Sequence, residues 1–86
     1  SIDPDRTLPG QWCIRGGVLI TCPRAVVGEW LEQLWRWQAI QALAIVARNP
    51  ERKRQLAGTV AWAHICNYES LEAVERNEYD LLVADE

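Results

Sequence analysis

The chain has 86 residues, a formal net charge of −3, five tryptophans, no phenylalanine and three cysteines. This length fits one small domain with a thin core, and the acidic balance argues against a general polyanion binder, which needs a basic surplus. An odd, sparse set of cysteines does not suit a secreted disulfide framework, and there is no signal-peptide pattern or apolar run of 18 residues, so we expect a soluble cytoplasmic protein that does not enter a membrane.

The N-terminal third predicts an arm followed by a hairpin. Two prolines and few apolar groups in residues 1–10 indicate an extended arm, and residues 11–86 then form a single small α+β domain. Gly16 and Gly17 separate two β-branched and aromatic runs, which is typical of a β-hairpin because a tight turn of this kind needs positive φ.

A long helix is predicted from Pro23 to Arg48, with proline tolerated in its first turn. One apolar stripe at helical spacing consists of Val27, Trp30, Leu31, Leu34 and Trp37. After Arg36 the polar side disappears and apolar residues point in all directions. This half of the helix is therefore expected to be the centre of the core or an interface with another chain.

The C-terminal half predicts shorter elements. Asn49 is expected to cap a second helix over residues 50–66, antiparallel to the first. Ser70 is expected to cap a short third helix over residues 71–76. Residues 79–84 alternate as a strand that adds a third strand to the hairpin sheet, but they also fit a continuous helix, and both alternatives stay open.

No motif for catalysis or for a cofactor is present. Cys13, Cys22, His64 and Cys66 are a chemically sufficient set for zinc, but eight residues separate the first two, and the last two lie about 200° apart on a helix. We therefore expect no metal, no cofactor and no enzymatic activity. A disulfide between Cys13 and Cys22 requires the hairpin to turn at residues 17–18 and is left open.

A basic cluster at the start of the second predicted helix is the basis of an alternative function. It consists of Arg48, Arg52, Lys53 and Arg54. Beside a helix N-terminus these cations are candidate phosphate contacts, which would make the protein a small nucleic-acid-binding regulator. The plainer interpretation is a solvated helix start, because few polar residues follow along the helix to contact bases.

The favoured function is a non-enzymatic protein-interaction module, homodimeric through the Trp-rich apolar helix. The predicted interface consists of Trp35, Trp37, Ile40, Leu43 and Val46. Trp35 is the leading exposed anchor, because it lies about 80° from the centre of the apolar stripe. An unknown protein partner is the other candidate, and the acidic C-terminal segment could engage a basic one, even as a mimic of nucleic-acid phosphates.

Overall fold

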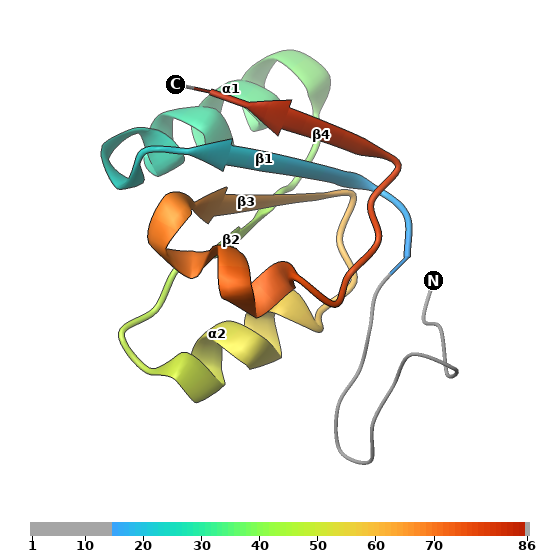
Figure 1. The fold of residues 1–86 in the computed structure, drawn as a ribbon. Helices are drawn as coiled ribbons and strands as arrows, with labels where there is room; N and C mark the ends of the chain where they lie inside the picture. The colour runs from blue at the N-terminus through green and yellow to red at the C-terminus, as the bar shows by residue number, and fades with distance from the viewer. Residues whose placement is uncertain (1–14, 86) are drawn as a thin grey trace.

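The computed structural model describes residues 15–85, which form a four-stranded sheet with helices on both faces (Figure 1). All strands run parallel, in the order β2-β3-β1-β4. The strands are β1 (Val18–Cys22), β2 (Leu43–Ile45), β3 (Ala63–Asn67) and β4 (Leu81–Ala84). The helices are η2 (Arg24–Val26), α1 (Val27–Gln38), α2 (Pro50–Ala57) and η3 (Tyr68–Val74), of which η2 and η3 are 3₁₀-helices.

The direction of each connection explains the layers. From β1 the chain moves past the position of β3 to β2 through α1, and it then returns to β3 through α2. Parallel connections are right-handed, so connections that move in opposite directions lie on opposite faces of the sheet. Accordingly α1 lies behind the sheet in Figure 1, while α2 and η3 lie on the other face.

The core is split by the sheet into two clusters. On the α1 side the buried residues are Ile20, Cys22, Val27 and Ile65. On the side of α2 and η3 they are Leu19, Ile45, Ala57, Cys66 and Val74. Both clusters draw alternate residues from the same strands, as the period of two requires, so the central strands are apolar on both faces.

The expectation of a small domain that mixes helices and strands is confirmed, but the hairpin is not. Strand β1 pairs in parallel with β3 on one side and with β4 on the other, so its edges are both occupied. Gly16 and Gly17 do have positive φ, at 97° and 85°. They serve a different purpose: the carbonyl of Gly17 accepts from the backbone N–H groups of Asp80 and Leu81 and so joins β1 to the start of β4. Residues 1–14, the predicted arm and the first strand of the hairpin, lie outside the described residues.

The prediction of one long helix from Pro23 to Arg48 is wrong, because α1 ends at Gln38. Ala39 has a left-handed backbone (φ 53°, ψ 30°), and its N–H bonds to the carbonyls of Leu34 and Trp35, which closes the helix. The apolar run that follows forms β2, where apolar residues on both sides fit a strand buried in a parallel sheet. Within residues 15–85 no helix is long and apolar enough to cross a membrane.

The second helix is also shorter than predicted. Asn49 caps it as expected, accepting from the N–H of Glu51 at 2.8 Å, but α2 ends at Ala57. In the rest of the predicted range, residues 58–62 form a connection and residues 63–66 belong to strand β3. Ser70 does not cap a helix; it lies inside η3, which starts at Tyr68. The strand alternative for the C-terminus is confirmed by β4, which extends the sheet beside β1.

Ala39→Gly should stabilise the fold. Glycine adopts the left-handed conformation without the steric cost that alanine incurs, and this gain exceeds the entropy that glycine loses on folding. We expect the free energy of unfolding in urea to rise by about 0.5–1 kcal/mol. Gln38→Gly, one residue earlier in the helix, is the control and should lower it by a similar amount. A loss of stability in Ala39→Gly would show that the helix does not end here.

Candidate protein interface at the end of helix α1

Two large aromatic side chains are exposed in the last turns of α1. Trp35 is 63% exposed and Trp37 is 73% exposed, whereas Trp30, two turns earlier, is half-buried and donates from Nε1 to Asp85 Oδ2 at 2.8 Å. Trp35 and Trp37 are two positions apart in the helix, so their side chains point about 200° away from each other around the helix axis. The two exposed tryptophans therefore lie on opposite flanks of the face that contacts the sheet. They therefore do not form one continuous surface.

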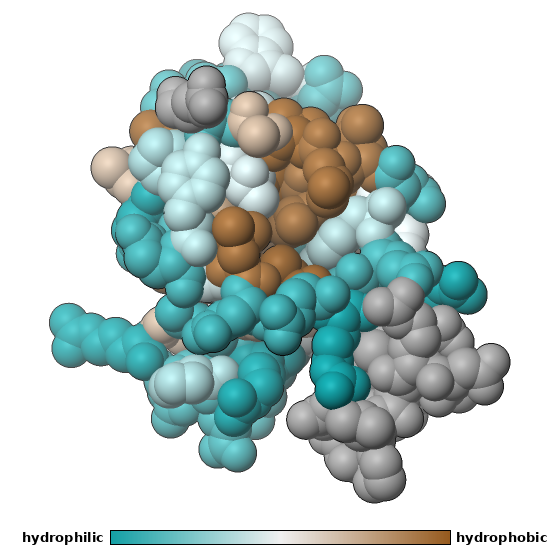
Figure 2. Space-filling view, in the orientation of Figure 1, coloured by the Kyte–Doolittle hydropathy of each residue, from teal (hydrophilic) through white to brown (hydrophobic). Residues whose placement is uncertain are grey.

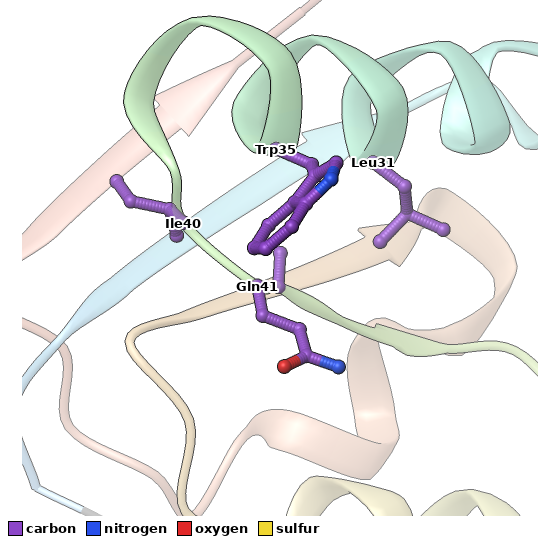
Figure 3. Close-up of a pocket in the computed structure, with 5 residues that line it drawn as sticks. Leu31, Trp35, Ile40 and Gln41 are labelled. Atoms are coloured by element: carbon purple, nitrogen blue, oxygen red, sulfur yellow. The ribbon is translucent and has the colours of Figure 1, made fainter.

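Trp35 borders a hollow between α1 and the segment that leads into β2 (Figure 3). We call this feature the α1–β2 hollow; its volume is about 260 Å³, and it is lined by Leu31, Trp35, Ile40, Gln41 and Ala42. In Figure 3 the indole of Trp35 lies between Leu31 and Ile40, and the amide of Gln41 extends away from the helix. Four apolar side chains and one amide suit an inserted apolar side chain with a nearby polar anchor.

The structure divides the predicted interface. Trp35 and Ile40 line the α1–β2 hollow together. Leu43 packs against the core cluster beside α2, and Val46 against the cluster beside α1, so both contribute to the core and not to an exposed helix face. Trp37 is exposed but on the other flank of α1.

The outer edge of β2 lies next to the hollow. Strand β2 pairs only with β3 among the described residues, so its other edge has backbone groups available for a further strand. The segment that lines the hollow, residues 40–42, runs directly into this strand. The hollow and the strand edge are thus consecutive along the chain, and together they are the candidate binding surface.

The basic cluster does not converge on a single site. Arg52, Lys53 and Arg54 are consecutive in α2, so they spread over about 200° of the helix. Arg52 donates to Gln55 at 3.4 Å, and Lys53 is half-buried. Arg48 and Arg54 are exposed. The N–H of Glu51 in the first turn already bonds to the Asn49 side chain, which occupies part of the anion-binding end of the helix.

His64 belongs to a buried hydrogen-bond network. It is 1% exposed, with Nε2 2.7 Å from the carbonyl of Thr59 and Nδ1 2.8 Å from the hydroxyl of Tyr79. A carbonyl only accepts, so Nε2 carries the hydrogen and Nδ1 accepts from Tyr79. Asn77 Nδ2 in turn donates to the hydroxyl of Tyr79 at 2.9 Å and to the carbonyl of Ala57 at 2.8 Å. The network ties β3 to the segments before and after it.

The cysteines and His64 are arranged differently from the prediction. His64 and Cys66 are two apart on a strand and not on a helix, so they share the face toward α2, while Cys22 lies on the opposite face. No group of three or more His, Cys, Asp or Glu within residues 15–85 is placed to hold a metal ion. Burial raises the pKa of Cys22 and raises that of Cys66 to about 11, so both thiols stay protonated and unreactive at neutral pH. The predicted partner Cys13 lies outside the described residues.

Two buried oxygen atoms were not anticipated from the sequence. Among the residues described, Asn67 Oδ1 and Ser70 Oγ are buried and have no hydrogen-bond partner. Asn67 is the last residue of β3, paired with the last residue of β1, and Ser70 follows it in η3. At this point the chain leaves the two strands toward opposite faces of the sheet. Open parallel sheets commonly bind ligands at such a point. The parallel order of the strands was needed to find it, and the sequence pattern indicated a hairpin instead.

Comparison of the chain with models of protein families, with curated proteins and with solved structures finds no match. The surface geometry is therefore the basis of the functional argument.

The network around His64 predicts a pH-dependent stability. Burial lowers the pKa of His64 below its ordinary value of 6.5. Between that value and the lower folded one, the unfolded chain binds more protons than the folded chain, so the free energy of unfolding falls as the pH falls through this window. Urea unfolding from pH 7.5 to pH 5 measures the slope.

His64→Gln is the control for this prediction, because glutamine keeps a polar side chain but does not titrate. It should lower stability at pH 7.5, since at least one buried partner loses its bond, and it should show a flatter pH profile. Equal slopes in the two proteins would assign the pH dependence to other groups.

Proposed function

We propose that the chain is a non-enzymatic protein-interaction module that forms a homodimer through the α1–β2 hollow and the adjacent edge of β2. The observation that supports this most is Trp35, a large side chain left 63% exposed beside an apolar hollow. Tryptophans in such positions are frequent anchors of protein interfaces. Ile40 and Leu31 extend the apolar contact on either side of it.

A second copy is the occupant that the charges favour. Residues 40–47 contain no charged side chain. Two β2 strands that pair antiparallel about a two-fold axis between residues 43 and 44 bring residue 40 opposite residue 47 of the other copy, without like charges in contact. This pairing also places residues 40–42, which line the hollow, opposite residues 45–47 of the other copy, and it extends the two sheets into one.

The other edge of the sheet is a poor dimer contact. An antiparallel pairing of two β4 strands, centred on Leu82 and Val83, would place Asp80 opposite Asp85 of the second copy at both ends. Like charges directly opposite each other destabilise a strand pair. This contrast supports β2 as the contact of the proposed dimer.

We also propose that the chain has no enzymatic role. In support, burial raises the pKa of both described thiols, so neither Cys22 nor Cys66 is a nucleophilic thiolate at neutral pH. The nucleic-acid alternative would depend on Arg48, Arg52 and Arg54, which are exposed, and on the half-buried Lys53. Retention on heparin that is lost between low and moderate salt would favour that alternative, since phosphate contacts release counterions.

Trp35→Ala should weaken self-association more than tenfold, because it removes the anchor from the hollow. Sedimentation equilibrium or light scattering over a concentration series gives the dimer affinity. Urea unfolding of the same variant should change little, because most of the side chain is already in contact with solvent.

Trp37→Ala is the matched control: it removes a tryptophan of similar exposure from the opposite flank of α1 and should leave the dimer affinity unchanged. Trp30→Ala should instead lower stability by more than about 2 kcal/mol, since it removes packing and the bond to Asp85. A wild-type mass near 9.8 kDa at high micromolar concentration would contradict the dimer. An equal effect of the two exposed tryptophans would contradict its location.

A further inference from the structure

The second open edge of the sheet, at β4, has backbone groups directed outward. The N–H of Leu81 donates to the carbonyl of Gly17, just before β1, and the N–H of Asp85 donates to the carbonyl of Thr21 in β1. Alternate residues of a parallel strand bond to the same neighbour, so Leu82 and Ala84 direct their N–H and C=O groups away from β1. Among residues 15–85 no strand pairs with this side of β4. It is a template to which an extended segment can add.

Three exposed side chains lie on the same face of the sheet, in β4 and in η3. Leu82 is 68% exposed on the face of the sheet that carries η3, and Tyr68 and Leu71 of η3 are 42% and 39% exposed. Tyr68 and Leu71 are three residues apart in a 3₁₀-helix, so they share one side, and the hydroxyl of Tyr68 donates to the carbonyl of Asp85 at the end of β4. We call these three side chains the β4 shelf. Figure 2 shows apolar surface gathered over β4 and the adjoining part of this face, above a hydrophilic lower half.

The surroundings of the shelf are acidic. Residues 69–85 carry six carboxylates and a single arginine. Asp80 and Asp85 stand at the two ends of β4, and Glu72 and Glu75 are exposed in and after η3. A strand added here meets apolar contacts in its middle and negative charge at its ends. The same charges oppose a second copy of this edge.

We propose that β4 binds an extended segment of another protein, with apolar residues at its centre and Lys or Arg at both ends. The segment adds a fifth strand, hydrogen-bonded to Leu82 and Ala84. Its central side chains pack on the β4 shelf, and its terminal cations lie near Asp80 and Asp85. This surface lies at the opposite edge of the sheet from the proposed dimer contact, so the two are independent.

Fluorescence polarisation with a labelled heptapeptide, Lys-Arg-Val-Leu-Val-Arg-Lys, tests the proposal with the full chain. We expect saturable binding that weakens at least tenfold when all four cations of the peptide are replaced by glutamate. Binding should also weaken several-fold when the salt concentration rises from about 50 to about 300 mM. Absence of binding to the wild-type chain would overturn the proposal. Equal affinity for the acidic peptide would overturn it as well.

Two variants locate the binding. Leu82→Pro removes an outward N–H at an edge position where proline is tolerated, and Leu82→Lys places a cation on the shelf at an exposed side chain; each should weaken peptide binding at least tenfold. Circular dichroism checks their fold, and Leu82→Lys keeps the test valid if the proline variant unfolds. Trp35→Ala is the control and should bind the peptide as the wild type does. Unchanged binding in a folded Leu82→Lys variant would contradict the assignment to β4.

Discussion

The pairing of β1 with parallel strands on both sides is the constraint on which the rest of the structure depends. A strand that bonds to β3 on one side and β4 on the other leaves no position for a hairpin partner, so every connection has to cross the sheet. The crossings place α1 on one face and α2 with η3 on the other. Both faces of the central strands are then buried, which lets a short chain build two core clusters on one sheet.

The same order leaves β2 and β4 as edges with opposite chemistry. The β2 edge is uncharged and adjoins the α1–β2 hollow, whereas β4 has Asp80 and Asp85 at its ends and the β4 shelf beside it. Charge, more than apolar area, therefore separates the two proposed partners: a second copy at β2 and a basic, extended segment at β4.

The parts of the fold that depend on local chemistry could be predicted from the sequence. These include the Asn49 cap, the positive φ at Gly16 and Gly17, the exposed flank position of Trp35 and a strand near the C-terminus. The apolar run after Trp37 could not be assigned, because a strand buried on both faces has no period, and Ala39 is not a residue that typically ends a helix in the left-handed conformation. Leu43 and Val46 were therefore expected on an exposed helix face, whereas they lie in and after β2, partly buried against the two core clusters. The β4 edge as a site depends on strand order, which no local pattern encodes.

Amide hydrogen exchange along β4 tests the central pairing most directly. If β1 holds β4 in parallel and the outer edge is open, the amides of Leu81, Val83 and Asp85 exchange slowly and those of Leu82 and Ala84 exchange fast. Slow exchange at all five positions would mean that another strand covers the outer edge. Protection of Leu82 and Ala84 alone would mean that the register with β1 is wrong, and with it the outward direction of Leu82 and Ala84.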